Sequence, residues 1–130
     1  MARPGYILIV EDDDDIREAL TQILELEGYA VREAANGREA LDISAEQPSP
    51  SLILLDLMMP VMDGWQFRSE QMKDPALSKV PVVVISADAS VHEKVASFGA
   101  ASVLPKPISL DRLLRAVETL YPLPARQPQT

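Results

Sequence analysis

Short runs of consecutive apolar residues recur along the chain, separated by stretches in which apolar residues follow a helical spacing. A short apolar run bounded by turn-forming residues is typical of a strand buried on both faces. Of the five runs, the one at Ala30–Ala34 is the least apolar, and the one at Ala101–Leu104 is short. The predicted strands are Tyr6–Val10, Ala30–Ala34, Leu52–Leu55, Pro81–Ile85 and Ala101–Leu104.

The stretches between these runs predict helices, and capping side chains indicate where each helix begins. The first helix should begin in the acidic run after Val10, with Asp14 or Asp15 as its cap, and end at Gly28. The other predicted starts are Asn36 (resembling a capping box with Glu39), Asp63, Ser90 (with Glu93) and Ser109. The corresponding predicted ends are about Glu46, about Lys73, Gly99 and Tyr121.

A strand followed by a helix, repeated five times, predicts an α/β fold. Right-handed crossovers would give a doubly wound, five-stranded parallel sheet with helices on both faces. We find no internal repeat and no domain boundary before Pro122. We therefore expect one domain over residues 1–121, and a proline-rich tail or linker over residues 122–130.

Composition narrows the classes of function. The chain has no cysteine, which excludes disulfides and thiolate metal sites. Its net charge of −8 disfavours direct binding to nucleic acid or anionic lipid and favours binding of a cation. No apolar run is long enough to span a bilayer, and the N-terminus lacks the apolar segment of a signal peptide. We therefore expect a cytoplasmic protein without a membrane partner.

Polar residues close four of the five predicted strands. Because the carboxyl ends of parallel strands open on one edge of the sheet, these side chains should meet there. They are Glu11, Asp12, Asp56, Ser86 and Lys106. Three carboxylates held together repel one another, and a hard divalent cation such as Mg²⁺ relieves that repulsion. A carboxylate nucleophile, Mg²⁺, a lysine and a hydroxyl are the groups needed to accept a phosphoryl group on aspartate.

Each feature taken alone has a simpler interpretation. The acidic run is more often a solvated helix start, and Asp56 alone could cap the helix that follows it. Ser86 alone would be a loop hydroxyl, and Lys106 a surface charge. The coincidence of these residue types at successive strand ends favours the functional interpretation.

Four motifs together make the chain similar to the receiver domain of a two-component response regulator, of the chemotaxis-regulator type. The motifs are I-V-E-D, L-L-D-L-M-M-P-V-M-D-G, V-I-S-A and K-P, each at the end of a predicted strand. The resemblance covers about Tyr6 to Tyr121. It implies a flavodoxin-like (βα)₅ fold.

The resemblance also implies a role for each matching residue. Asp56 resembles the phospho-acceptor, Glu11 and Asp12 the acid pair that binds Mg²⁺, and Met58 the residue whose backbone carbonyl completes the metal site. Ser86, followed by Ala87, resembles the switch hydroxyl, and Lys106 the lysine that pairs with the phosphoryl group. The Lys106–Pro107 bond resembles the cis peptide of the family.

One position departs from the family pattern. Receiver domains often carry an aromatic switch residue three positions before the lysine, where this chain has Val103. A short β-branched side chain cannot swing a large surface between inside and outside. We expect the signal to leave through the loop after Ser86 and the helix predicted over residues 91–98.

The implied function is a signalling switch rather than a metabolic enzyme. A histidine kinase or phosphotransfer protein would donate the phosphoryl group, and an output protein, or a second copy of the chain at the last helices and strand, would bind the altered surface. Two alternatives remain: a flavin or nucleotide carrier, and a receiver-like module used only for protein binding. The acids after the first strand and the absence of a glycine-rich phosphate loop disfavour the carrier.

Overall fold

The computed structural model describes residues 5–46, 48–57, 62–87 and 99–122. Within these ranges, strands alternate with helices as the apolar pattern predicts. The strands are β1 (Ile7–Val10), β2 (Val31–Ala34), β3 (Leu52–Asp56), β4 (Val82–Ser86) and β5 (Ser102–Pro105). The helices are α1 (Asp14–Leu26), α2 (Gly37–Ser44), α3 (Gly64–Lys73) and α5 (Leu110–Leu120). The helix predicted to start at Ser90 and the tail from residue 123 lie outside the described residues.

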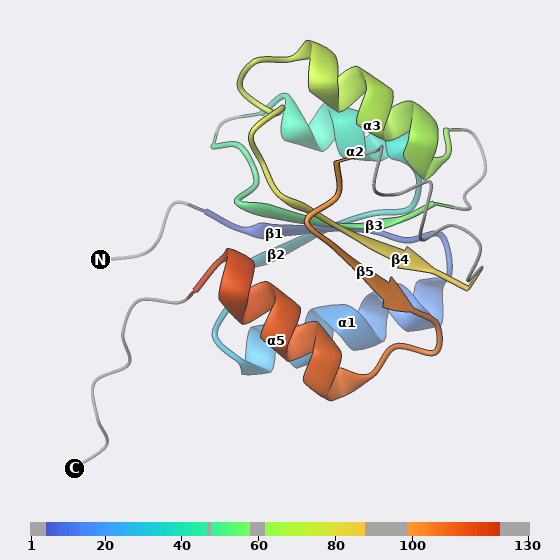
Figure 1. The fold of residues 1–130 in the computed structure, drawn as a ribbon, viewed down its shortest axis with the longest axis vertical. Helices are drawn as coiled ribbons and strands as arrows, with labels where there is room; N and C mark the ends of the chain where they lie inside the picture. The colour runs from blue at the N-terminus through green and yellow to red at the C-terminus, as the bar shows by residue number, and fades with distance from the viewer. Residues whose placement is uncertain (1–4, 47, 58–61, 88–98, 123–130) are drawn as a thin grey trace.

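The strands form one parallel sheet with the order β2-β1-β3-β4-β5. Helices α1 and α5 cover one face of the sheet, and α2 and α3 cover the other (Figure 1). This order and layering confirm the predicted flavodoxin-like α/β fold. The strand order reverses beside β1, which in such folds marks the edge where ligands bind.

The core has two parts, one on each face of the sheet. Alternate residues of a strand point to opposite faces, so Leu8 and Val10 join the cluster under α2 and α3, while Ile7 and Ile9 join the cluster under α1 and α5. Every residue of β1, β3 and β4 is buried. Burial on both faces explains why these strands are continuous apolar runs in the sequence.

Four strands begin one residue later than predicted: β1, β2, β4 and β5. The residue before the strand still takes part in the ladder in all four, since the N–H of Ala101 before β5 donates to the carbonyl of Val82 at 2.9 Å. The carbonyls of Tyr6, Ala30 and Pro81 accept hydrogen bonds from Ser51, Ile7 and Ile53, respectively. The predicted and observed strands therefore differ here only in which residue is counted as the first of the strand.

The start of α1 corrects the sequence analysis. The N-cap is Asp13, whose side chain accepts a hydrogen bond of 3.0 Å from the backbone N–H of Ile16. Asp14 and Asp15, the predicted caps, lie in the first turn instead. The backbone N–H of Glu11 still bonds to Ala34 of β2, at 3.0 Å. Only Asp12 therefore lies between the last residue bonded to β2 and the cap of α1.

The other caps are close to prediction. Asn36 caps α2, but Glu39 accepts from the N–H of Ala35 rather than Asn36, so the reciprocal box is displaced by one residue. Helix α2 also ends at Ser44 instead of about residue 46. Helix α3 has the predicted bounds and a full capping box, and α5 has its predicted cap. No helix among the described residues is long and apolar enough to cross a membrane.

Candidate functional site

The ends of β1, β3, β4 and β5 bring the predicted site residues to one edge of the sheet. The parallel register pairs Val10 with Leu55, Asp56 with Ile85, and Ser86 with Pro105. Glu11 and Lys106 directly follow β1 and β5. The predicted convergence of polar side chains is therefore present in the fold.

Glu11, Asp12 and Asp56 form a group that could hold a metal ion. Each offers a carboxylate oxygen, and these oxygens lie within 4.8 Å of one another. Glu11 is fully buried and Asp56 is 3% exposed, whereas Asp12 is exposed. Two buried carboxylates and one open to solvent suit a hard cation that keeps part of its water shell, as Mg²⁺ does.

Glu11 provides a test of whether these residues fit a cation. Its side-chain atom Oε1 is buried and has no hydrogen-bond partner among the described residues. Lys106 Nζ lies 2.9 Å from it and forms an ion pair with it. A buried carboxylate oxygen with unused acceptor capacity is stabilised by a second cation, so the residues fit Mg²⁺.

Lys106 bridges the two buried acids. Its Nζ lies 2.9 Å from Glu11 Oε1 and 3.3 Å from Asp56 Oδ2, and its side chain is 21% exposed. Burial by itself lowers the pKa of Lys106, but the contacts with Glu11 and Asp56 and their charges outweigh burial, and the net pKa is raised. The ammonium is therefore held in its charged form beside Asp56. The Lys106–Pro107 bond is cis.

Ser86 is buried at the end of β4. It is 3% exposed, and its carbonyl accepts a hydrogen bond of 3.0 Å from the backbone N–H of Lys106. Val103 lies opposite Val84 on the next strand and packs against the core cluster under α2 and α3. Since residues two apart share a face, Ser86 lies on the same face of the sheet as Val84 and Val103.

The chain after Asp56 returns close to the acceptor at Gly64. The N–H of Gly64 donates to the carbonyl of Leu57 at 3.0 Å. A Cβ at Gly64 would lie 2.7 Å from Leu57 Cα and 2.8 Å from the carbonyl oxygen of Asp56. Glycine at this position admits this close approach. Met58, the predicted carbonyl ligand, lies outside the described residues.

Arg17 is a neighbour of the site that the sequence analysis missed. Its Nη1 donates to the backbone carbonyl of Glu11 at 2.8 Å. The one signal available in the sequence is the spacing of Asp14 and Arg17, three residues apart on a helix, which form an ion pair. That spacing alone gives no indication of the contact with Glu11.

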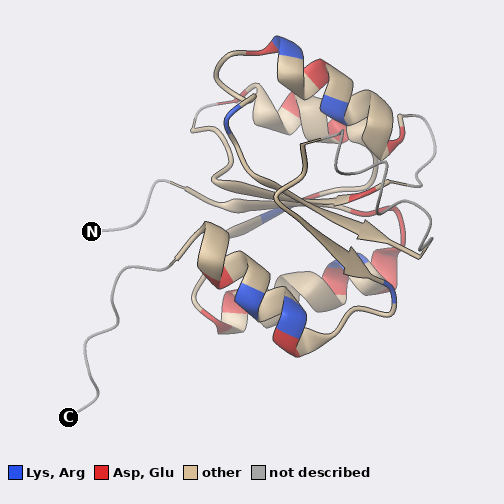
Figure 2. Cartoon of the chain, in the orientation of Figure 1, with Lys and Arg blue, Asp and Glu red and all other residues tan. Residues whose placement is uncertain are grey.

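The distribution of charge agrees with a cation site at this edge. Acidic residues gather where α1 begins, and a basic segment directly follows β5 (Figure 2). Asp13, Asp14 and Asp15 belong to the start of α1.

Comparison with known proteins gives a consistent result. The family model of the response regulator receiver domain matches residues 7–118 of this chain. The response regulator MprA of Mycolicibacterium vanbaalenii is 40% identical over 119 residues, which cover 90% of this chain and 50% of that protein. MprA of Mycobacterium avium is 40% identical over 116 residues, covering 88% of this chain and 50% of that protein. The chain thus spans about half the length of these relatives.

Solved structures agree in fold. The chemotaxis protein CheY4 of Vibrio cholerae has a TM-score of 0.82 at 28% identity, covering 91% of this chain and 99% of CheY4. A response regulator receiver protein of Pseudomonas putida has a TM-score of 0.83 at 27% identity, covering 92% of this chain and 99% of that protein. With the family match spanning nearly all described elements, the chain belongs to the response regulator receiver domain family.

Proposed function

We propose that Asp56 accepts a phosphoryl group from the phosphohistidine of a histidine kinase or phosphotransfer protein. One observation carries the proposal: Lys106 Nζ lies 3.3 Å from Asp56 Oδ2 within a cluster that also contains Glu11 and Asp12. Nucleophile, charge-neutralising lysine and candidate metal ligands thus occupy one edge of the sheet. The proposal places the receiver domain at residues 1–121 and treats residues 122–130 as a tail or linker.

The transfer is a displacement at phosphorus. A carboxylate oxygen of Asp56 attacks the phosphorus atom, the new O–P bond forms, and the P–N bond to the donor histidine breaks, its electron pair leaving with the imidazole. The Lys106 ammonium neutralises charge on the phosphoryl oxygens. Glu11, Asp12, Asp56 and the backbone carbonyl of Met58 would hold Mg²⁺, which when bound shields charge on the phosphoryl group. The domain would catalyse only this transfer and the hydrolysis of the resulting aspartyl phosphate.

The test is uptake of phosphoryl from a small donor. Incubation with acetyl phosphate and MgCl₂ should add one phosphoryl group to the intact mass, and hydroxylamine should remove it because an acyl phosphate is labile. Replacement of MgCl₂ by EDTA should suppress uptake. A chain that never gains mass in MgCl₂ would be a receiver-like module for protein binding only, and a coloured purified protein would support the flavin carrier instead.

We assign the switch to Ser86. Its buried hydroxyl would turn toward the new phosphoryl group, because an added anion with three acceptor oxygens attracts nearby donors. Val103 is partly buried against the core cluster opposite Val84 and has no aromatic ring to rotate. The signal would therefore leave through the chain that follows Ser86 and Ala87.

The route of the signal predicts a pattern of amide chemical shifts. Addition of a beryllofluoride phosphoryl mimic should change the shifts most at residues 56–59 and 86–98, and little at residues 101–104, because the Val103 side chain has restricted χ1 freedom. The measurement is a pair of ¹H–¹⁵N spectra with and without the mimic. If the largest changes remote from Asp56 fall on residues 101–104, then Val103 takes part in the switch and this proposal is wrong.

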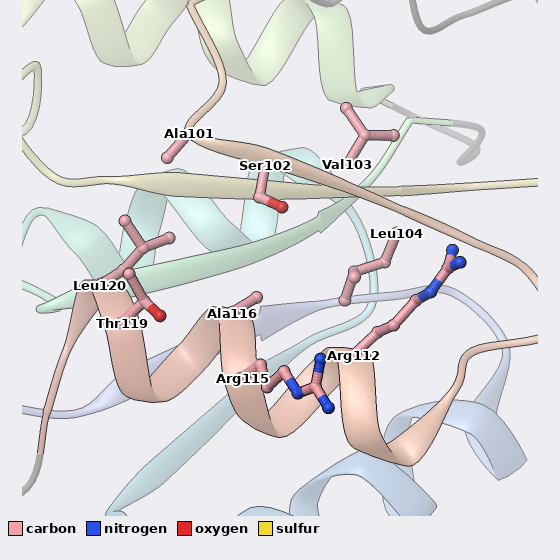
Figure 3. Close-up of a pocket in the computed structure, with 9 residues that line it drawn as sticks. All are labelled: Ala101, Ser102, Val103, Leu104, Arg112, Arg115, Ala116, Thr119 and Leu120. Carbon is pink, nitrogen blue, oxygen red and sulfur yellow. The ribbon is translucent and has the colours of Figure 1, made fainter.

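We place the output partner, or a second copy of the chain in a homodimer, on the surface formed by β5 and α5. Strand β5 lies at an edge of the sheet. A groove of about 350 Å³ runs between it and α5, with the side chains of Ser102 and Leu104 on the α5 side (Figure 3). Arg112 and Arg115 line its rim. We further propose that the domain acts in the cytoplasm and binds neither nucleic acid nor membrane directly.

A further inference from the structure

The short connection between β1 and α1 carries two of the three candidate metal ligands. Glu11 is fixed through its side chain as well as its backbone: its N–H bonds to Ala34, and its Oε2 accepts from the N–H of Asp13 at 3.1 Å. Asp12 is different. It is exposed, and the structure records no hydrogen bond to its side chain from the described residues. The position of Asp12 therefore depends on the backbone that carries it.

Arg17 holds that backbone. Its Nη1 donates to the carbonyl oxygen of Glu11 at 2.8 Å. Because a peptide unit is planar, this carbonyl lies in one rigid plane with the nitrogen and Cα of Asp12. Fixing the Glu11 carbonyl therefore fixes the position of the Asp12 Cα and limits where its carboxylate can reach.

Arg17 is itself clamped by two other acids. Its Nε lies 3.3 Å from Glu33 Oε1 on β2, and its Nη2 pairs with Asp14 on α1. Glu33 in turn accepts a hydrogen bond from Thr21 on the next turn of α1. The Arg17 side chain is 15% exposed. A planar guanidinium presents its N–H donors in a rigid fork and can donate to three acceptors at once. A lysine ammonium lacks this forked arrangement of donors.

We propose that Arg17 is a positioning residue for cation binding, which holds the Glu11–Asp12 peptide so that the Asp12 carboxylate meets Glu11 and Asp56. The inference rests on the proposed metal site. Arg17 also keeps Asp14 engaged on α1, which separates that acid from the candidate ligands next to it in sequence.

The sign of the effect separates positioning from plain electrostatics. A positive charge near a cation site opposes cation binding, so removal of Arg17 for electrostatic reasons alone would tighten binding. Loss of positioning would weaken it. Groups that orient metal ligands typically change metal affinity by about 10- to 100-fold when removed.

The experiment is calorimetric titration of the full chain with MgCl₂ at constant ionic strength, well below the melting temperature of every variant. Arg17→Ala should raise the Kd for Mg²⁺ about tenfold. Arg17→Lys keeps the charge without the fork, and its Kd should lie between those of Arg17→Ala and the wild type. Arg38→Ala removes an exposed arginine from α2, and its Kd should match the wild type.

Several outcomes would overturn the inference. A lower Kd in Arg17→Ala would make Arg17 an opposing charge only. An unchanged Kd with a lower melting temperature would make it a structural residue. A wild-type Kd in Arg17→Lys would show that the fork is unnecessary, and this variant decides the matter if Arg17→Ala does not fold. Absence of Mg²⁺ binding by the wild type would remove the proposed metal site, and with it this inference; normal wild-type binding with unaffected variants would remove this inference alone.

Discussion

Asp56→Asn should abolish phosphoryl uptake from acetyl phosphate in MgCl₂. The amide has nearly the shape of the carboxylate, so the 3% exposed position should remain packed. It lacks the anionic oxygen that attacks phosphorus, and no covalent adduct can form on it. The measurement is intact mass after incubation, with the wild type run in parallel.

The matched control is Asp111→Asn, which makes the same substitution at an exposed residue in the first turn of α5. This variant should gain one phosphoryl group as the wild type does. A mass gain that persists in Asp56→Asn would mean that another residue is the acceptor, and peptide mapping of that product would identify it.

The fold could be predicted because its core strands are buried on both faces. Burial forces residues such as Ile7, Ile53 and Val83 to be apolar without interruption, and that run is visible in the sequence. The edge strand β5 is only partly buried, and its run is correspondingly short. Alternation of strands with helices then leaves few topologies other than a parallel doubly wound sheet.

The convergence of the candidate site residues could be predicted for a geometric reason. In a parallel sheet, the residue at the carboxyl end of each strand is placed by the register, so Asp56, Ser86 and Lys106 meet without any further information. The ion pairs of Lys106 with Glu11 and Asp56 follow from this placement.

Contacts made between elements could not be predicted. The acidic run predicted Asp14 or Asp15 as the cap of α1, whereas the structure has Asp13, two residues after Glu11, whose N–H bonds to Ala34 of β2. The hold of Arg17 on the Glu11 carbonyl depends on Glu33 of β2, far away in the sequence. The need for glycine at position 64 depends on how closely the chain returns to Leu57. Each of these is a tertiary contact that leaves no periodic pattern.

Lys106→Met should lower the melting temperature in EDTA. The variant keeps the apolar stem, which lines a cleft of about 240 Å³ between α1 and the start of α5, and removes the ammonium. The buried carboxylates of Glu11 and Asp56 then face each other without the cation that bridges them. Removal of one partner from a buried ion pair costs about 3–5 kcal/mol. Since Lys106 is 21% exposed, we expect about 2 kcal/mol here.

Lys73→Met is the control, because Lys73 pairs with Glu70 on the surface, where the two side chains are 72% and 44% exposed. Exposed pairs contribute about 0–1 kcal/mol, so its melting temperature should change little. Saturating MgCl₂ should raise the melting temperature of Lys106→Met more than that of the wild type, since the cation binds the folded state and no longer shares the carboxylates with an ammonium.

Lys106→Met should also alter the loss of stability at high pH. The net pKa of Lys106 is raised in the folded chain, because the contacts with Glu11 and Asp56 outweigh the opposing effect of burial. A folded pKa above the unfolded one contributes stability that is complete below the usual lysine pKa of about 10.4 and is lost as the pH rises through the folded value. In EDTA, the difference in melting temperature between the wild type and Lys106→Met should therefore be constant near neutral pH and shrink above about pH 10. Equal melting temperatures at neutral pH would show that the ammonium does not stabilise the two acids, and a difference that grows with alkaline pH would reverse the assigned direction of the pKa.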